Sequence, residues 1–207
     1  MENKWMKWGR ALQVIAQNGL AYSTNVFDIE RFEAVRRIAA EMIADHAGME
    51  AGQVEDVFAL EQGYATPKVD VRGAVFQDDR ILLVRENLDG GRWTLPGGWA
   101  DVTDSPSEAV TREILEEAGY ETRAIKLAAV YDRSRHGHPR YYFSIYKLFF
   151  ICEITGGAPA AETTETGGAA FFREDDLPEL SLGRVTPEEI HTLFRHYRNP
   201  HLPTEFD

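Results

Sequence analysis

The sequence predicts an α+β protein in which a small helical domain precedes a larger body of strands and helices. Apolar residues recur at helical spacing up to about residue 46, and from Lys68 the apolar period changes to two. Strand-like segments then flank one central helical pattern, and a last helical pattern opens at Thr186. Strands and helices in this order favour an α+β body. We expect a helical domain over residues 1–65 and a second domain over residues 66–207.

The composition is typical of a globular protein and excludes several classes of function. A chain of 207 residues can bury one sizeable core and a small second one, and its 27% charged content lies in the globular range. A formal net charge of −12 argues against a broad basic surface, so we expect no stable nucleic-acid partner. The single cysteine, Cys152, allows no internal disulfide and is typical of a reducing compartment. Because no apolar run approaches the length of a membrane span, we expect a cytoplasmic protein with no membrane partner.

The N-terminal domain is predicted to contain two long helices with more apolar surface than they can bury between them. The first helix should end at Asn18-Gly19, and the second should open at Asp28 as its cap. The surplus apolar surface must meet either a second copy of the chain or the body of the same chain. The apolar stripe of the first helix consists of Trp5, Trp8, Leu12 and Ile15.

The second domain is predicted to begin with a β-hairpin that leads into a glycine-rich turn. Thr66-Pro67 marks the boundary, and a turn at Asp78-Asp79 joins the strand from Lys68 to a return strand over residues 81–84. A loop then feeds into the glycine turn of residues 95–98. Later strands are expected over residues 121–132, 142–154 and 169–172.

A capped helix should follow the glycine turn. Ser105 offers a capping serine, Pro106 suits the first helical position, and Glu108 stands three residues after the cap. Gly119 is the natural residue for the left-handed position just past a helix end. The helix is therefore predicted to run from Pro106 to about Ala118.

This helix carries a cluster of carboxylates on one face. Glu113, Glu116 and Glu117 stand at positions i, i+3 and i+4, and Arg112 can pair with Glu108 and Glu116. One guanidinium cannot balance four acids, and clustered carboxylate oxygens suit hard cations such as Mg²⁺ or Mn²⁺. Taken alone, the same pattern also describes a solvated acidic helix face.

The stretch from Gly98 to Tyr120 resembles the Nudix box, a motif of the form G-x5-E-x7-R-E-U-x-E-E-x-G-U in which U is a large apolar residue. Asp104 stands where the motif has glutamate, and Tyr120 is a loose match at the last apolar position. The resemblance implies a Nudix hydrolase with an α/β/α sandwich and a mixed sheet. The matching positions are Gly98, Arg112, Glu113, Ile114, Glu116, Glu117 and Gly119.

The resemblance extends over nearly the whole chain, to a bacterial Nudix subgroup with a helical N-terminal domain. Members of this subgroup are dimeric and hydrolyse nucleoside diphosphates linked to a second moiety, X. CDP-choline pyrophosphatases and ADP-ribose hydrolases are described in it. The resemblance therefore implies a homodimer, and a nucleoside diphosphate-X compound as the small-molecule substrate. The segments that carry the likeness lie at residues 5–43, 64–76, 146–157 and 171–190.

Hydrolysis of a phosphoanhydride requires positive charge beside its oxygens, because their negative charge repels an incoming nucleophile. The resemblance implies that Mg²⁺ or Mn²⁺ supplies this charge and that Glu113, Glu116 and Glu117 are the metal ligands. Glu113 and Glu117 are expected to lead, with the carbonyl of Gly97 as a further ligand.

The remaining box residues and the general base are less closely defined. Arg112 is expected to orient a glutamate, and Asp104 either braces the loop to the helix or binds metal with a shorter reach. In related ADP-ribose hydrolases the base lies on a late loop, which here offers Glu162 and Glu165, and we favour Glu165. Alternatively, Glu116 is the base, or the metal activates water without a separate base.

The most basic stretch of this acidic chain runs from Tyr131 to Tyr142. It could form a lip that contacts the phosphates or the base of a substrate, or it could be a solvated hairpin tip. The sequence leaves both interpretations open. Its candidate substrate-binding residues are Arg133, His136, His138 and Arg140.

The sequence thus predicts a metal-dependent hydrolase that splits a nucleoside diphosphate-X compound into a nucleoside monophosphate and X-phosphate. CDP-choline-like and ADP-ribose-like compounds are the leading substrates. One alternative is a nucleotide-ligand sensor without turnover, which the near-intact acidic box disfavours. Another is RNA-end or exonuclease activity, which the net charge of −12 disfavours.

Overall fold

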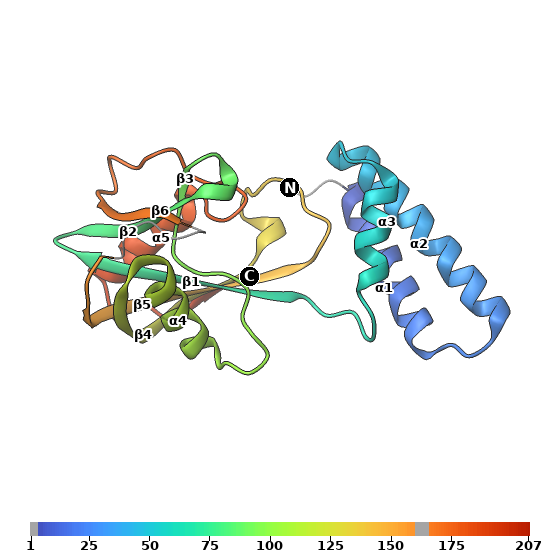
Figure 1. Cartoon of the computed structure of the whole chain (residues 1–207), viewed down its shortest axis with the longest axis horizontal. Coiled ribbons are helices and arrows are strands. Elements are labelled where there is room, and N and C mark those ends of the chain that lie inside the picture. Colours follow the sequence, from blue (N-terminus) through green and yellow to red (C-terminus); the bar gives the residue numbers. More distant parts are fainter. Residues whose placement is uncertain (1–3, 160–165) are drawn as a thin grey trace. The chain divides into compact units, whose positions relative to one another are not determined.

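A computed structural model describes residues 4–159 and 166–207, and its helices and strands are shown in Figure 1. The chain divides into two units. The first comprises Met1–Lys68 with Arg140–Ser144, and the second comprises Val69–Pro139 with Ile145–Asp207. Each unit has a hydrophobic core of its own.

The first unit consists of three helices, α1 (Lys4–Tyr22), α2 (Val26–Ala47) and α3 (Ala51–Leu60). Helices α1 and α2 approach closely at Gly9, where an added Cβ would lie only 2.7 Å from Cγ1 of Ile43. Small residues at such crossings let side chains of the neighbouring helix fill the space between the backbones. The core of the unit contains Met6, Ala40, Ile43, Ala44, Val54 and Phe58.

Helix α1 does not end at Asn18-Gly19, as the sequence had predicted, but continues to Tyr22. A glycine inside a helix costs about 1 kcal/mol relative to alanine. Glycine is needed at this position, because a Cβ at Gly19 would lie 2.4 Å from the ring of Phe32 on α2 and would clash with it. Packing against α2 therefore outweighs the local helix-stop signal.

Helix α2 begins earlier than predicted, and its cap is not Asp28. The N-cap is Asn25, whose side-chain oxygen accepts a hydrogen bond from the backbone N–H of Phe27 at 2.9 Å. Asp28 lies in the first turn and forms an ion pair with Arg31. Both asparagine and aspartate suit caps, so the sequence offered two candidates and the first is used.

The predicted apolar stripe of α1 is largely exposed within the chain. Trp5, Trp8 and Ile15 retain 49%, 43% and 55% of their accessible surface, whereas Met6 and Ala16 on the other side are buried. The helices of this unit therefore bury one face of α1 and leave a second apolar face uncovered. Large apolar faces on a protein surface commonly mark interaction sites.

The second unit is built on a mixed sheet of seven strands. Their order is β3-β2-β1-β5-β4-β7, and β6 pairs with β2 outside this path. Strands β4 and β7 run parallel, whereas β2 pairs antiparallel with β1, β3 and β6, and β4 with β5. The expected hairpin turn is present, with positive φ at Asp78 and Asp79. The strands are β1 (Lys68–Gln77), β2 (Arg80–Glu86), β3 (Arg92–Thr94), β4 (Tyr120–Asp132), β5 (Ile145–Gly157), β6 (Thr166–Phe172) and β7 (Glu205–Phe206).

Helices α4 (Pro106–Ala118) and α5 (Pro187–Arg198) cover opposite faces of this sheet. Leu82 and Val84 of β2 belong to the core beneath α4, while the alternate residues Ile81 and Leu83 belong to the core beneath α5. Successive residues of a strand point to opposite faces, so both faces of β2 are buried. This arrangement is the predicted α/β/α sandwich.

Both helices of the sandwich have the predicted capping boxes. The Ser105 hydroxyl accepts from the Glu108 N–H and the Glu108 carboxylate accepts from the Ser105 N–H, and α4 ends at Gly119 with φ of 78°. Thr186 and Glu189 make the same reciprocal pair at the start of α5. Short 3₁₀ turns, η1 (Asn87–Asp89) and η2 (Arg133–Arg135), follow β2 and β4.

Candidate active site

The glycine turn before α4 is pressed against strand β1. Gly97 has φ of 138°, and a Cβ added there would lie 2.0 Å from the carbonyl oxygen of Val71, so a side chain has no space. The Val71 N–H donates to the Gly98 carbonyl, and the Gly73 N–H donates to the Pro96 carbonyl, each at 2.9 Å. The turn is therefore fixed to the sheet by its own backbone.

Glu117 joins helix α4 to this turn. Its Oε2 accepts a hydrogen bond from the Gly97 N–H at 2.8 Å. Burial raises the pKa of Glu117 to about 7, against the opposing effects of the Arg72 charge and the Gly97 hydrogen bond, while the nearby charge of Glu113 adds to the rise. A buried carboxylate of this kind is stabilised by any cation placed beside it.

Arg112 gathers several acids of the box around one guanidinium. Its Nε donates to Asp104 at 3.0 Å, and its NH1 donates to Glu113 at 2.9 Å and to Glu116 at 3.0 Å. Its NH2 also lies 3.3 Å from Asp101. These partners raise the pKa of Arg112, with the hydrogen bond to Asp104 as the largest cause.

One predicted partner of Arg112 is wrong. Glu108 binds the hydroxyl and the N–H of Ser105, at 2.6 and 2.9 Å, and therefore serves the helix cap. Asp104 takes its place on the guanidinium, although it is one methylene shorter than the motif's glutamate. The Asp104–Arg112 contact ties the loop before α4 to the helix.

The box supplies carboxylate oxygens, the donors that hard divalent cations prefer, but its side chains do not converge on one point. Glu113 is mostly buried, which raises its pKa, although the ion pair with Arg112 acts in the opposite direction. A Cβ at Gly98 would lie 3.3 Å from Glu113 Oε2, so the glycine leaves room beside this carboxylate. Within residues 4–159 and 166–207, no three acidic, histidine or cysteine side chains lie close enough to enclose a metal ion. Glu113 and Glu116 instead point to Arg112, and Glu117 to the glycine turn.

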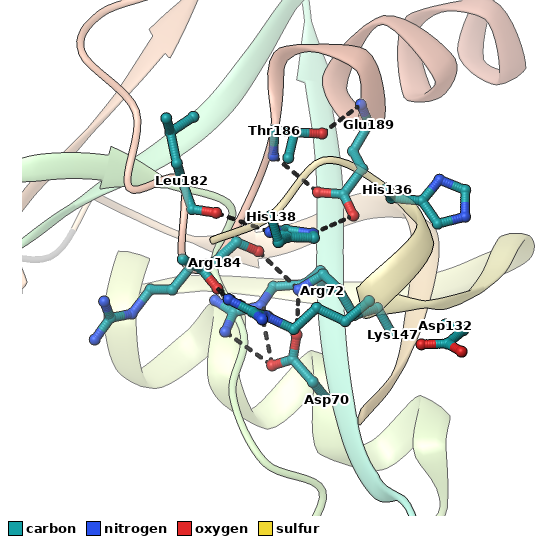
Figure 2. Close-up of polar contacts among 12 residues, drawn as sticks. Asp70, Arg72, Asp132, His136, His138, Lys147, Leu182, Arg184, Thr186 and Glu189 are labelled. Carbon is teal, nitrogen blue, oxygen red and sulfur yellow. Dashed lines mark hydrogen bonds and ion pairs between the residues drawn. The ribbon is translucent and has the colours of Figure 1, made fainter. Parts of the chain in front are cut away.

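A buried cluster of charges lies next to the glycine turn, and sequence analysis missed it (Figure 2). Arg72 donates to Asp70 through Nε and NH2 and to the Leu95 carbonyl through NH1 at 3.1 Å. Lys147 Nζ donates to Asp70 and, at 2.7 Å, to the Arg184 carbonyl. All three charged side chains of this Asp70–Arg72–Lys147 cluster are buried.

The Asp70–Arg72–Lys147 cluster affects the pKa of two carboxylates of the Nudix box. The charge of Arg72 opposes the rise in the pKa of both Glu117 and Glu113, so the guanidinium lies near both carboxylates. Glu86, at the end of β2, is also buried and acts on Glu117 in the opposite sense. One signal could have revealed the cluster, because Lys147 is followed by five apolar residues in strand β5, where a charge is unexpected.

The basic stretch places its candidate residues in different surroundings. The His138 side chain is fully buried, with Nδ1 2.8 Å from the Leu182 carbonyl and Nε2 2.8 Å from Glu189 Oε1 (Figure 2). Arg133 is also buried and donates to the carbonyls of Gly183 and Pro139.

The other two candidates of this stretch are more accessible. His136 stacks on the ring of Tyr131 and lies 2.9 Å from Asp207, with a quarter of its side chain exposed. Arg140 belongs to the first unit, where it donates to the His46 carbonyl at 2.6 Å. The candidate bases Glu162 and Glu165 lie outside the described residues.

Comparison with known families matches both units. A model described as "UDP-X-like, N-terminal oligomerisation domain" matches residues 3–58, and the NUDIX domain model matches residues 66–194. Among the described residues, no helix is both long and apolar enough to span a bilayer.

Individual relatives are similar over the whole chain. A Bacillus subtilis protein named "Putative ADP-ribose pyrophosphatase YjhB" is 45% identical over 208 residues, covering 100% of this chain and 99% of that protein. The crystal structure of a UDP-X diphosphatase is 32% identical with a TM-score of 0.64 and covers 100% of both chains. That of an ADP-ribose pyrophosphatase from Streptococcus suis is 42% identical with a TM-score of 0.63, covering 69% of this chain and 100% of that chain.

The fold, the box and the glycine turn agree with these comparisons. The sandwich presents the acidic face of α4 beside a turn that only glycine can form. The matched Nudix model spans this whole arrangement. The chain therefore belongs to the Nudix family and is a Nudix pyrophosphohydrolase.

Proposed function

We propose that this protein hydrolyses the pyrophosphate bond of a nucleoside diphosphate linked to a moiety X, giving a nucleoside monophosphate and X-phosphate. The observation that carries the proposal is the docking of the Glu117 carboxylate on the Gly97 N–H, beside the largely buried Glu113. The names of the full-length relatives favour ADP-ribose-like or UDP-linked compounds, and CDP-choline-like compounds remain candidates from the sequence.

A divalent cation, Mg²⁺ or Mn²⁺, is the proposed cofactor. Glu113 and Glu117 would hold it together with the Gly97 carbonyl, and Glu116 would contribute a further oxygen from the same helix face. When bound, the cation supplies positive charge to the diphosphate oxygens and lowers the pKa of a water molecule. The Asp104–Arg112 contact supports a bracing role for Asp104, since its carboxylate already accepts a hydrogen bond from Arg112 Nε.

The protein's own groups orient the reactants and move the proton. Arg112 holds Glu113 and Glu116 in fixed directions, at 2.9 and 3.0 Å. For the general base we keep two candidates, Glu165 on the late loop and Glu116 on α4. Of the basic stretch, His136 is the candidate for direct contact with substrate, because it lies in the same unit as the box and a quarter of its side chain is exposed.

We also propose that the first unit forms a homodimer. The matched family model is described as an oligomerisation domain, and an apolar face of α1 is exposed within the chain. The free, buried thiol of Cys152 is consistent with the cytoplasm as the proposed location.

The proposed function is tested by product analysis on a panel of nucleoside diphosphate conjugates. The panel contains ADP-ribose, UDP-sugars, CDP-choline and a short RNA, each with Mg²⁺ or Mn²⁺. Glu117→Gln should lower kcat/KM by about a hundredfold or more, because it removes a charged metal ligand. Glu153→Gln changes an exposed glutamate of β5 in the same way and should leave the rate unchanged.

Two outcomes would contradict the proposal. Turnover of the RNA alone would show a nuclease. Absence of turnover on every compound, together with thermal stabilisation by one of them, would show a sensor.

A further inference from the structure

The buried face of helix α1 carries one polar side chain, the amide of Gln13. The other buried residues of this helix, at spacings of three and four, are a methionine, a glycine and an alanine. Gln13 is 7% exposed, and neither its side-chain nitrogen nor its oxygen has a hydrogen-bond partner among the described residues. Buried polar groups are nearly always hydrogen-bonded, because an unpartnered one costs folding free energy. The amide therefore calls for a partner other than these residues.

Gln13 lines a cavity of about 190 Å³, which we call the amide cavity. All the residues that line it belong to the first unit, and they come from α1, from the end of α3 and from the segments before β1 and β5. Pockets for drug-sized ligands measure about 300–1,000 Å³, whereas a protein cavity of about 150 Å³ binds one molecule of benzene. The amide cavity therefore suits a molecule with a single ring and is too small for a nucleotide.

Aromatic side chains form part of the wall of the amide cavity. The rings of Phe58 and Tyr142 lie edge to face with centroids 6.5 Å apart, and those of Tyr142 and Phe143 do so at 4.7 Å. Phe58 is fully buried in the core of this unit. Aromatic rings favour stacked or edge-to-face contact with another flat ring. The wall thus favours a planar ligand.

The charged groups of the wall already have partners. Lys68 Nζ lies 2.8 Å from Glu61 Oε1 and 4.6 Å from the centre of the Phe143 ring. Arg10 donates to the Tyr141 carbonyl at 3.4 Å. Because these charges are compensated within the unit, the cavity offers no unpaired charge to a ligand, and a neutral molecule fits it best.

The amide of Gln13 defines the polar edge of such a ligand. A glutamine side chain presents a donor next to an acceptor, whichever way round its nitrogen and oxygen are assigned. Its complement is another donor–acceptor pair, as in the two hydrogen bonds that a glutamine forms with the edge of a base. The terminal torsion of glutamine is soft, so the amide can turn to meet this edge at little cost.

We propose that the amide cavity binds a small, neutral, single-ring compound with an N–H next to a C=O, as in a free pyrimidine base or a ring carboxamide. Gln13 exchanges two hydrogen bonds with this edge, and the rings of Phe58, Tyr142 and Phe143 enclose the ligand. The site goes beyond the proposed function, because a nucleoside diphosphate is too large for the cavity and the carboxylate box belongs to the other unit.

The test is calorimetric titration of the full chain, without added metal, with uracil and with nicotinamide. Each compound is paired with an analogue that has the same ring but no N–H, 1,3-dimethyluracil and N,N-dimethylnicotinamide. At least one of the two amide compounds should bind saturably, and its methylated analogue should bind about tenfold more weakly or worse, since it cannot donate to the glutamine.

Gln13→Met keeps the length of the side chain and removes both hydrogen-bonding atoms. The Kd of the compound that binds should rise about tenfold or more. The Tm of the ligand-free protein should rise by about 2 °C or more, because a buried unpartnered group is gone. Gln53→Met, at an exposed glutamine of α3, is the matched control and should change neither quantity.

A second variant tests the cavity without touching the amide. Thr66 is exposed and lines the cavity, so the ring of Thr66→Phe should fill the space and raise the Kd about tenfold or more. Thr24→Phe, at an exposed threonine between α1 and α2, should leave binding unchanged. This pair decides the assignment even where Gln13→Met does not fold.

Several results would overturn the assignment. Failure of both amide compounds to bind would show that neither is a ligand of this class. Equal binding of the methylated analogues would exclude recognition of the amide edge. Undiminished binding by both Gln13→Met and Thr66→Phe would place the ligand elsewhere, the catalytic box included. Loss of oligomers in Gln13→Met, measured by light scattering, would show that a second copy of the chain supplies the partner of the amide. None of these results depends on turnover of the substrate panel.

Discussion

In the Nudix unit, the buried carboxylate of Asp70 binds the side chains of both Arg72 and Lys147. Arg72 extends to the Leu95 carbonyl at the glycine turn, and Lys147 extends to the Arg184 carbonyl in the segment between β6 and α5. Taking such charges out of water costs several kcal/mol per ion, which their mutual attraction and hydrogen bonds must offset. The three charged side chains are therefore stable together, and removal of any one of them leaves an uncompensated buried charge that destabilises the fold.

Lys147→Met tests this at a single residue. Removal of the ammonium leaves Asp70 with one cation fewer, so the free energy of unfolding should fall by about 3 kcal/mol. The measurement is chemical denaturation, and Arg123→Met at an exposed pair should cost less than about 1 kcal/mol. A loss as small in Lys147→Met as in the control would show that the cluster is not a stabilising unit.

The Asp70 carboxyl also predicts a pH dependence of stability. Burial acts to raise its pKa, but the charges and hydrogen bonds of Arg72 and Lys147 prevail and lower it below the usual 3.8. The unfolded chain therefore takes up this proton first as the pH falls, so the stabilisation is complete above about pH 5 and is lost towards pH 3.

Asp70→Asn removes this titrating group. Its unfolding free energy should lie well below that of the wild type at pH 7, and the difference should shrink as the pH falls to about 3. Denaturation midpoints measured across this range provide the check, with Asp56→Asn at an exposed site of α3 as the control substitution. A difference that stays constant or widens on acidification would contradict the sign of the shift.

At the scale of elements, the site depends on how α4 meets the glycine turn. The turn is bound to β1 by two backbone hydrogen bonds, and Glu117 of α4 is bound to the turn by a third. Helix, turn and strand thus share one set of contacts. The position of the carboxylates is set by the backbone of the turn, which a Cβ at Gly97 would displace from Val71.

Gly97→Ala should accordingly disrupt both stability and activity. The positive φ and the 2.0 Å approach to the Val71 carbonyl predict a loss of about 1–3 kcal/mol in unfolding free energy and at least about tenfold in kcat/KM. Thermal denaturation and steady-state kinetics measure the two effects. Gly52→Ala is the control, because a Cβ there meets nothing within 4 Å and alanine favours helix α3. An unimpaired Gly97→Ala enzyme would show that the turn does not position the carboxylates.

Elements whose signals are local could be predicted from the sequence. The bounds of α4 followed from Ser105, Pro106, Glu108 and Gly119, and all four act as expected. The end of α1 could not be predicted, because it depends on how Gly19 packs against Phe32 of another helix. Local chemistry decides the first case and tertiary packing the second.

The candidate site was predictable only in part, for the same reason. The box glutamates are close in sequence and share a helix face. Asp70, Arg72 and Lys147 come from two strands, and alternating charges on a strand ordinarily indicate a solvated face. Here helices cover both faces of the sheet, so these charges are buried.

At the scale of the whole molecule, an apolar face of α1 remains to be covered. Trp5, Trp8 and Ile15 are each close to half exposed within the chain. Burial of apolar surface gains about 25 cal/mol per Å², so a second copy that covers these side chains would gain substantial stability. The description of the matched N-terminal family model agrees with such an assembly.

Ile15→Glu should weaken this assembly by placing a charge in an apolar contact. Light scattering behind size-exclusion chromatography should show a dimer for the wild type and a shift towards monomer for the variant at micromolar concentration. Leu60→Glu, at an exposed leucine of α3, is the control and should remain dimeric. A wild-type protein that stays monomeric at high concentration would refute the dimer.

The Asp70–Arg72–Lys147 cluster also constrains how this lineage can change over time. A substitution at one of the three leaves a buried charge without its partner, so single replacements should be eliminated and the three should be kept or exchanged as a group. Arg92 and Leu182 face no such restriction, because both side chains are partly exposed on the surface of the Nudix unit. Exposed positions of this kind can therefore change by single steps, while the buried cluster is inherited as a group.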